Sequence, residues 1–422
     1  MTNPAGKSQP QSRQEVLAKM PAAEMVQREL AGAKSLDDFF GKEGIFARLF
    51  ASTLEQLLEV EMTEHLGYQP YAVEGRNTGN SRNGKRPRQI RTSSGDLTIA
   101  VPRDRKSEFE PAILAAHQTS TNELETKIIY LYGKGVSTRD IADTLCDIYG
   151  VNVSAATISA ITDKIKALAE AWQSRELAAI YPIIYLDAIH IKLRHDGKVE
   201  NIAVYNVLGM DLEGRKDILG HWVGNGGEGS NFWLSVVKDL QARGVKDIFI
   251  ACIDGLTGFK EAIQAIFPRV LIQRCIIHQI RNSLKYVTWR DRKEFAGDLR
   301  SVYTAINRES GELALLGVAE KWGKRYPMAV KCWESDWEDL ATFFDFPQEI
   351  RRLIYTTNAV EGYHRQIRKV IKTKSSFPTA DAVKKIMFLA DRDITEKWTM
   401  PVPNWANILN QLAIRFEGRF FI

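Results

Sequence analysis

A chain of 422 residues can form two or three domains, and its 44% hydrophobic and 26% charged residues are typical of a folded globular protein. No apolar run reaches the roughly 18 residues that a membrane span needs, so we expect no membrane partner. The N-terminus also lacks the charged-then-apolar order of a secretory signal. The four cysteines are scattered, which is typical of reduced thiols and not of a disulfide framework.

The net charge of +5 is unevenly distributed along the chain. Nine Lys or Arg residues lie in 76–106, opposed only by Asp96 and Asp104, so this segment carries +7 and the remainder −2. A basic stretch rich in Asn, Gly and Ser can follow a phosphate backbone and release its counterions. The alternative is a solvated, flexible loop.

The first elements in chain order are helical, apart from the basic segment. Residues 1–40 are polar and predict only short helical turns. Apolar residues at helical spacing predict an amphipathic helix over 44–65, ended by Gly67. Within the basic segment, one short strand is predicted at 97–101, stopped by Pro102.

Residues 121–170 predict further helices, two of them short and joined by a turn that contains Gly150. With Ser154 as the N-cap of the second helix, this pair fits a helix-turn-helix. In that arrangement the second helix enters the major groove and presents Thr157 and Lys164, and Arg139 lies on the first. Such pairs also occur as plain structural hairpins, but the neighbouring basic segment favours DNA binding.

The pattern changes after Trp172. Apolar runs at 182–189, 201–208 and 217–222 predict three strands joined by short turns. A helix over 230–243, a strand ending at Asp254, a helix over 256–267, a last strand and a helix from about Ile276 follow. This order predicts a mixed α/β sheet, an antiparallel meander followed by parallel crossovers. Residues 279–355 are predicted to be helical, and so is the tail.

Two aspartates stand out in these predicted strands. Asp187 lies inside an apolar run, where a carboxylate is costly unless it is paired or binds a metal; a solvent-facing strand end is the alternative. Asp254 follows a buried strand. An aspartate in a turn before a helix is common and is the alternative, but sheets of this class gather ligands at the carboxyl ends of their strands. Two carboxylates on neighbouring strands suit a two-metal site, and oxygen ligands favour Mg²⁺ or Mn²⁺.

A third carboxylate has to come from elsewhere in the chain, and Glu361 is the candidate. It begins a helix rich in basic residues, although a glutamate at a helix start is usually only a favourable partner for the helix dipole. Cys275 and His278 form a C-x-x-H just after the last strand, without a second Cys/His pair at zinc spacing. We therefore expect His278 on a helix near the active site, or simply packed.

Several long motifs in the same order resemble bacterial insertion-sequence transposases of the Mutator type, over about residues 47–416. The matching phrases are NSRNGKRPRQIRT, VPRDRKSEFEP, YLDAIHIKLR, QARGVKDIFIACIDGLTGFKEAI, FPRVLIQRCIIHQIRNS and IYTTNAVEGYHRQIRK. The resemblance implies a ribonuclease-H-like catalytic domain whose DDE triad falls on Asp187, Asp254 and Glu361. It also places Cys275, His278 and Asn358 near the active site, although a more Asn-like pattern is expected where Gly362, Tyr363 and His364 stand.

The resemblance further implies two-metal hydrolysis at the element's ends, followed by attack of the freed 3′-OH on target DNA. The expected organisation is a mainly helical basic region (1–108), a helix-turn-helix domain (109–172) and a catalytic domain (173–422) with an all-α insertion at about 279–355. The expected partners are the terminal inverted repeats and target DNA, bound by a homodimer or larger assembly without a nucleotide cofactor, in the bacterial cytoplasm at the nucleoid. The DNA contacts are assigned to Arg82, Lys85, Arg86, Arg88, Arg91, Arg139, Thr157, Lys164, Arg365, Arg368 and Lys369.

Two other classes of protein share some of these features. A catalytically silent DNA-binding regulator, or a domesticated transposase, would use the helix-turn-helix and tolerate loss of an acid. A nuclease on the same fold would explain the metal site, but not the long DNA-binding region or the helical insertion.

Overall fold

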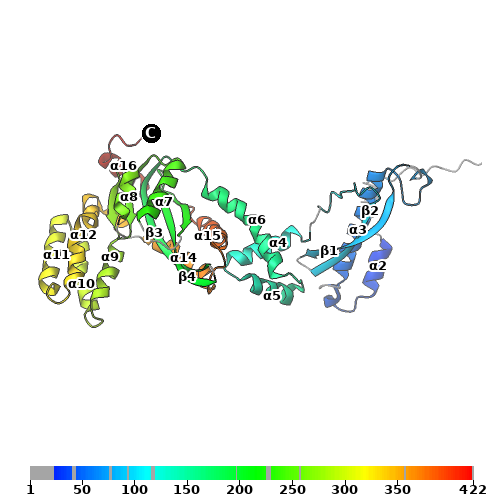
Figure 1. Cartoon of the computed structure of the whole chain (residues 1–422), viewed down its shortest axis with the longest axis horizontal. Helices are drawn as coiled ribbons and strands as arrows, with labels where there is room; N and C mark the ends of the chain where they lie inside the picture. The colour runs from blue at the N-terminus through cyan, green and yellow to red at the C-terminus, as the bar shows by residue number, and fades with distance from the viewer. Residues whose placement is uncertain are drawn as a thin grey trace, which may run out of the picture. The chain divides into compact units, whose positions relative to one another are not determined.

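The computed structural model describes residues 23–39, 44–75, 78–92, 95–115, 119–195, 197–224, 230–255, 258–355 and 358–420 (Figure 1). The chain forms two compact units. The first holds Met1–Tyr132 and Val136–Asp163, and the second holds Gly133–Gly135 and Lys164–Ile422. Among the helices in the described ranges, none is long and apolar enough to cross a membrane.

The first unit is built around one long amphipathic helix, α3 (Ile45–Leu66), as the sequence predicts. It ends where Gly67 adopts a left-handed conformation (φ 78°), which costs glycine little. Short elements surround it: α2 (Ala23–Ala31), η1 (Leu36–Phe39) and η2 (Val73–Gly75). Leu54 and Leu58 of α3 form a small core with apolar residues of the segment that follows.

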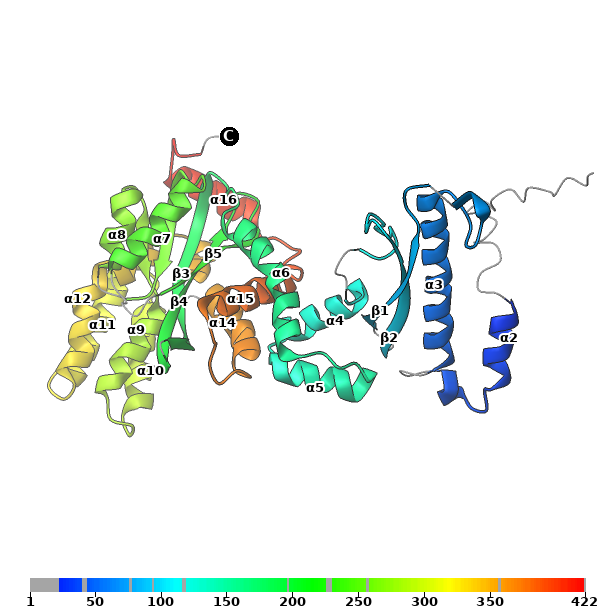
Figure 2. The same ribbon diagram turned by 45° about the vertical axis from the view of Figure 1, so that its right-hand side comes forward.

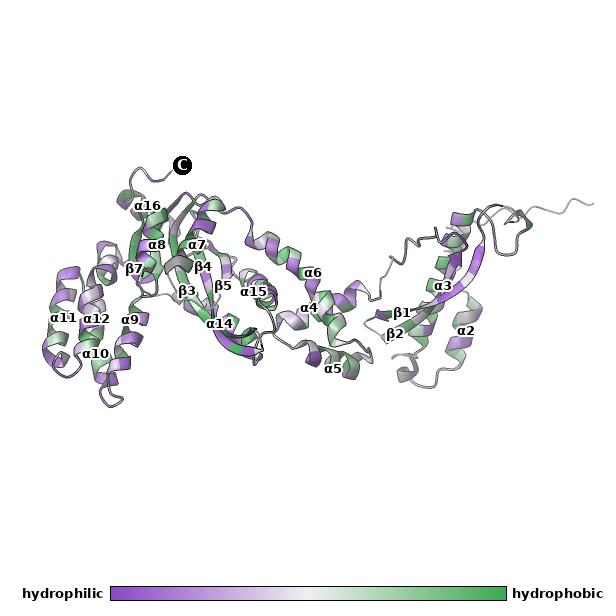
Figure 3. Ribbon diagram, in the orientation of Figure 1, coloured by the Kyte–Doolittle hydropathy of each residue, from purple (hydrophilic) through white to green (hydrophobic). Residues whose placement is uncertain are grey.

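The basic segment forms a two-stranded antiparallel ribbon, β1 (Arg82–Thr92) and β2 (Gly95–Asp104). The prediction of one short strand at 97–101 was therefore wrong in extent, and Pro102 does not stop β2 but lies inside it, opposite Lys85. A ribbon of two strands has outward edges, and proline is tolerated there because it removes no bond from a second neighbour. Figure 3 shows long hydrophilic stretches along this ribbon.

Three helices follow the ribbon: α4 (Asn122–Gly133), α5 (Thr138–Tyr149) and α6 (Ala155–Gln173). The caps are those the sequence predicts. The side chain of Ser154 accepts a hydrogen bond from the backbone N–H of Thr157 at 3.1 Å, and Gly150 ends α5 in a left-handed conformation (φ 62°). The two helices and the turn between them are confirmed as elements, although α6, with 19 residues, is longer than the short helix predicted. The boundary of the two units falls within α6.

The second unit contains a five-stranded mixed sheet in the order β5-β4-β3-β6-β7. Its strands are β3 (Ile180–His195), β4 (Lys198–Met210), β5 (Lys216–Val223), β6 (Asp247–Ile253) and β7 (Leu271–Arg274). β3, β4 and β5 pair antiparallel, whereas β6 pairs parallel with both β3 and β7. The predicted meander with parallel crossovers is confirmed, although β3 and β4 are longer than predicted.

Helices cover both faces of this sheet (Figure 2). On one face, α7 (Ser230–Ala242) and α8 (Phe259–Ile266) pack over a hydrophobic core, in which the rings of Trp233 and Phe259 stack at 3.9 Å. On the other side, α14 (Asn358–Ile371) packs against β3 and α15 (Ala380–Thr395) against β5. The polar side chains of the candidate site lie among these elements.

The predicted helical stretch between the sheet and α14 is helical as expected. It consists of α9 (Ile276–Ser283), η3 (Leu284–Tyr286), α10 (Arg292–Tyr303), α11 (Arg308–Trp322), α12 (Pro327–Leu340), η4 (Ala341–Asp345) and α13 (Gln348–Ile354). Its core includes the fully buried Trp333, whose indole N–H donates to Ser283 Oγ at 2.7 Å. The tail adds α16 (Trp405–Arg415).

Candidate active site

Asp187 and Asp254 lie next to each other at the end of the sheet because of strand register. Leu186 of β3 pairs with Ile253 of β6 in parallel register, so the next residue on each strand is an aspartate. Asp187 is only 6% exposed, while the Asp254 side chain is 34% exposed. β6 ends there, and β3 continues to His195.

Helix α9 brings His278 to these carboxylates. The backbone N–H of Cys275, the buried residue before α9, donates to the carbonyl of Ile253 at 2.9 Å, which fixes the start of the helix beside Asp254. His278 Nδ1 lies 3.6 Å from Asp254 Oδ1. One ligand atom from each of Asp187, Asp254 and His278 lies within 4.8 Å of the others.

In this group, burial and the neighbouring charges shift the pKa values of Asp187 and His278 in opposite directions. Burial raises the pKa of Asp187 to about 6, against the favourable charge of His278. For His278, burial lowers the pKa, but a hydrogen bond with Cys275 and the charge of Asp254 outweigh it and raise the pKa to about 9. A protonated His278 thus partly compensates the two carboxylates.

Glu361 lies on α14 and faces the same helix α9. Its Oε1 lies 2.7 Å from Nη2 of Arg281, three residues after His278, so the same face of α9 offers a cation to Asp254 and to Glu361. The segment before α14 is tied to α9 because the N–H of Ile276 donates to the carbonyl of Tyr355 at 3.2 Å. Glu361 is not within the 4.8 Å group, and the side chain of Asn358 lies outside the described residues.

The helix of Glu361 nevertheless passes directly beside Asp187. One turn after Glu361, His364 places Nδ1 3.5 Å from Asp187 Oδ2. Arg368, one further turn along, lowers the pKa of Asp187 through its charge. Burial, followed by the charge of Arg368, lowers the pKa of His364 to about 3, so this imidazole is neutral.

These residues fit a divalent cation. Two carboxylates converge beside the imidazole of His278, and carboxylate oxygens suit Mg²⁺ or Mn²⁺. Glu361 Oε1 is a buried atom that is compensated by the ion pair with Arg281. A buried carboxylate with a raised pKa is also a group that a bound cation would stabilise.

Sequence reasoning missed four buried polar residues behind Asp187, namely Asn206, His221, His364 and Asp391. A signal was present for two of them. Asn206 and His221 stand in strands whose neighbours are apolar, and a buried polar side chain there must find a hydrogen-bond partner.

The first unit holds a basic cleft of about 880 Å³ along the ribbon. Arg86, Arg88, Arg91 and Arg103 line it. Of these, Arg88 donates to the carbonyl of Ala115 at 2.9 Å and Arg91 to that of Asn152 at 3.1 Å. Two further predicted DNA contacts also have partners within the protein. The guanidinium of Arg82 donates to the carbonyl of Tyr68 and to Thr63 Oγ1, and Lys85 pairs with Glu59 at 2.8 Å.

The remaining predicted DNA contacts lie on helices. Arg139 on α5 is exposed, and Thr157 is half-buried, with its hydroxyl 2.9 Å from that of Ser154. Lys164 on α6 is exposed. On α14 the exposed residues of the predicted set are Arg365, Arg368 and Lys369.

A mixed sheet with two neighbouring carboxylates places the chain among the proteins whose site can bind a divalent cation. The sequence profile described as "Transposase, Mutator family" matches residues 22–401. The chain is 38% identical to a probable transposase for insertion sequence element ISRM3-like of Sinorhizobium fredii, over 94% of this chain and 98% of that protein. A probable insertion-sequence transposase of Corynebacterium diphtheriae is 36% identical over 76% of this chain and 99% of its own length.

The chain therefore belongs to the Mutator family of transposases, which act on insertion sequences. Among solved structures, a chain of the Drosophila P element transposase strand transfer complex has a TM-score of 0.34 and 9% identity. That match covers 66% of this chain and 92% of the solved one.

Proposed function

We propose that this transposase cuts and joins DNA at the ends of its insertion sequence, with Asp187, Asp254 and Glu361 holding two divalent cations on a ribonuclease-H-like catalytic domain. The observation that carries the proposal is the convergence of Asp187, Asp254 and His278 within 4.8 Å, with the helix of Glu361 beside Asp187. The strand order, with an antiparallel meander followed by parallel strands, is compatible with that fold.

The residues of the chain have separate tasks in this proposal. Bound Mg²⁺ or Mn²⁺ would supply the Lewis acid chemistry for phosphoryl transfer to water and then to the 3′-OH. Asp187, fixed in a central strand, is the rigid carboxylate, and Asp254 at a strand end is the more adaptable one. His278 holds a proton facing Asp254, and Arg281 holds Glu361, so α9 compensates the acids before a cation arrives.

DNA recognition is proposed for residues 1–172. The basic cleft of the ribbon offers guanidinium groups to phosphates, which position DNA without specifying sequence. The helix pair α5 and α6, in the proposed domain 109–172, would bind the terminal inverted repeats. The catalytic domain would occupy 173–422, with its insertion at about 279–355. Because two ends must be cut together, the active assembly would be at least a homodimer.

The test is cleavage and strand transfer on DNA carrying the element's ends, with Mg²⁺. Asp187→Ala, Asp254→Ala and Glu361→Ala should each lose both reactions and still bind the ends. Glu334→Ala, an exposed glutamate on α12, is the matched control and should behave as wild type. An acid variant with near-normal activity would remove that residue from the site.

Two further outcomes separate the other classes of protein. If the wild-type protein binds the ends but cuts with neither Mg²⁺ nor Mn²⁺, it is a DNA-binding regulator. If it cuts but never joins a free 3′-OH end to target DNA, it is a nuclease.

A further inference from the structure

A continuous chain of buried polar side chains runs from α15 across the sheet to the candidate catalytic aspartate. Its members, which we call the buried relay, are Asp391, His221, Asn206, His364 and Asp187. All five are less than 9% exposed, and Asn206 is completely buried. Register explains the alignment, because Asp187 pairs with Asn206 across β3 and β4, and Asn206 pairs with His221 across β4 and β5.

The hydrogen bonds of Asn206 give the relay a direction. Its Nδ2 donates to the carbonyl of Val204 at 3.0 Å and lies 3.1 Å from His364 Nε2. An amide nitrogen can only donate, so Nε2 of His364 must accept, and the ring proton is on Nδ1. That Nδ1–H faces Asp187 Oδ2 at 3.5 Å, while Oδ1 of the same carboxylate accepts the N–H of Ala188 at 2.8 Å.

The other end of the relay is fixed on several sides. His221 Nδ1 donates to Asn206 Oδ1 at 2.7 Å, and its Nε2 is hydrogen-bonded to Asp391 Oδ2. The hydroxyl of Tyr363 donates to Asp391 Oδ1 at 2.9 Å. These bonds hold the His221 ring in one orientation, which in turn decides which way the Asn206 amide faces.

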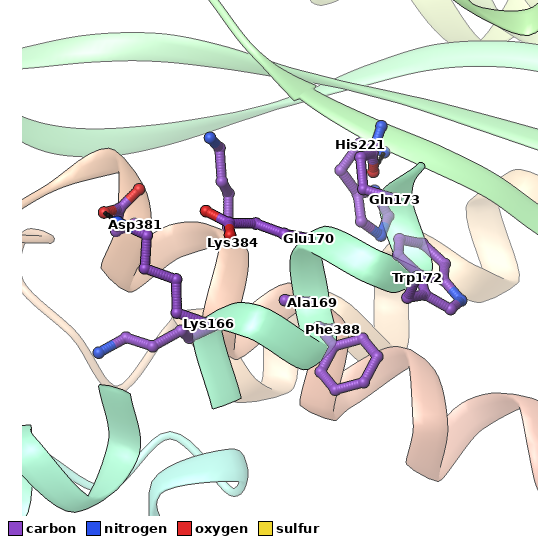
Figure 4. A pocket seen from close by; sticks show the side chains of 10 residues that line it. Lys166, Ala169, Glu170, Trp172, Gln173, His221, Asp381, Lys384 and Phe388 are labelled. Atoms are coloured by element: carbon purple, nitrogen blue, oxygen red, sulfur yellow. Dashed lines mark hydrogen bonds and ion pairs between the residues drawn. The ribbon is translucent and has the colours of Figure 1, made fainter. Parts of the chain in front are cut away.

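Helix α6 covers this end of the relay. His221 lines a cavity of about 140 Å³ with Trp172 and Gln173 (Figure 4). The Trp172 ring stacks on His221 at 5.5 Å, and Tyr363 stacks on it at 6.2 Å. Gln173 Oε1 accepts the backbone N–H of His221 at 3.0 Å. The imidazole is therefore held between two aromatic rings.

We propose that the buried relay makes His364 a positioning residue: it holds Nδ1–H toward Asp187 and so orients this carboxylate for its cation. The proposal rests on the proposed function, since it takes Asp187 as a cation ligand. Hydrogen-bond partners behind metal ligands orient them, and their loss typically costs about 10–100-fold in metal affinity or activity. A polar cluster that served packing alone would affect the stability of the fold but not the affinity of Asp187 for its cation.

Two substitutions of His364 separate these roles, because each keeps a different half of the imidazole. In His364→Asn the amide nitrogen can take the place of Nδ1, so the donor to Asp187 is retained. In His364→Gln the side chain reaches Asn206, but no donor faces Asp187. We expect Mn²⁺ affinity, measured by electron paramagnetic resonance without DNA, to fall about 10–100-fold in His364→Gln and to stay within about threefold in His364→Asn.

A second readout does not depend on activity or metal. The chain has seven histidines, so selective ¹⁵N labelling gives few ring signals, and His364→Asn identifies that of His364 by its loss. In the metal-free wild type, we expect His364 to carry its proton on Nδ1, and in Asn206→Leu we expect a mixture of tautomers. Protonation on Nε2 in the wild type would overturn the proposal even if the variants failed to fold.

Asp187→Asn distinguishes failure of the relay from failure of the proposed function. If Asp187→Asn loses Mn²⁺ while His364→Gln binds it as wild type does, the relay proposal alone is wrong. If Asp187→Asn binds Mn²⁺ as well as wild type, Asp187 is no ligand and both proposals are wrong.

Discussion

Charged side chains gather in two regions of this molecule, and their surroundings differ. At the end of the sheet, Asp187 is buried, and each of its carboxylate oxygens faces a group supplied by the protein. On the ribbon, Arg86 and Arg103 are exposed and line an open cleft. A buried charge is costly unless its partners are fixed, whereas an exposed charge costs little and contributes through its number.

This contrast decides what a substitution should change in each region. At the sheet end, removal of a charge should alter protein stability and cation binding. On the ribbon, it should alter DNA affinity and the dependence of that affinity on salt. Four substitutions, in order of decreasing effect, test whether the two regions separate in this way.

Asp187→Asn should stabilise the metal-free protein at high pH. The folded-state pKa of about 6 is above the ordinary value of 3.8, so the stability that Asp187 contributes is fully present below pH 4 and lost as the pH rises through 6. At pH 8 the variant should therefore gain on the order of 2–3 kcal/mol in free energy of unfolding. Urea denaturation in the presence of a chelator, at pH 4 and at pH 8, measures this difference in free energy of unfolding. A difference of equal size at the two pH values would contradict the burial argument.

Arg86→Gln combined with Arg103→Gln should weaken DNA binding and leave Mn²⁺ binding unchanged. Two lost phosphate contacts should lower the slope of log affinity against log salt by about 2, and affinity at 0.1 M salt on the order of 50-fold. Fluorescence anisotropy across a salt series measures both. An unchanged slope would mean that the cleft does not face phosphates.

Arg82→Gln should behave differently from its neighbours on the ribbon. Its guanidinium bonds to Tyr68 and Thr63, so the loss should be about 1–2 kcal/mol of stability in the first unit. The salt slope should change by less than about 1. Thermal unfolding measures the stability, and the same anisotropy series measures the salt slope. A decrease of the slope by a full unit would place Arg82 among the phosphate contacts instead.

Arg281→Gln should have the smallest effect. The pair with Glu361 is half exposed and worth at most about 1 kcal/mol, so releasing the carboxylate should tighten Mn²⁺ binding no more than about fivefold. Calorimetric titration with Mn²⁺ measures the change. Weaker binding than wild type would show that Arg281 supports the site and does not compete with the cation.

Much of the second unit could be predicted from its sequence, because buried strands leave uninterrupted apolar runs. The ribbon could not be predicted, since β1 has a single buried apolar residue, Ile90, and its other positions are polar, basic, glycine or proline. Two-stranded pairing of such a segment depends on α3, whose Leu54 and Leu58 cover one end of the ribbon. That contact is between residues distant in sequence, and local patterns do not show it.

The candidate site likewise contains residues that could be predicted from the sequence and residues that could not. Asp187 and Asp254 are recognisable because each ends or interrupts an apolar strand. Glu361 has no such context and was reached only through the family resemblance. The relay combines Asn206, His221 and Asp391, which are separated by at least 15 residues, and their alignment depends on strand register.

The distribution of the site along the chain has a consequence for its synthesis. The ribbon and the helix pair end by Gln173, whereas the site needs residues 187, 254, 278 and 361, and the relay extends to Asp391. Domains fold as they leave the ribosome, N-terminal part first. A nascent or truncated chain that stops before Glu361 therefore carries the whole basic ribbon without a complete set of acids. If residues 1–172 bind the element's ends as proposed, such a fragment would occupy them and shield them from the full-length enzyme.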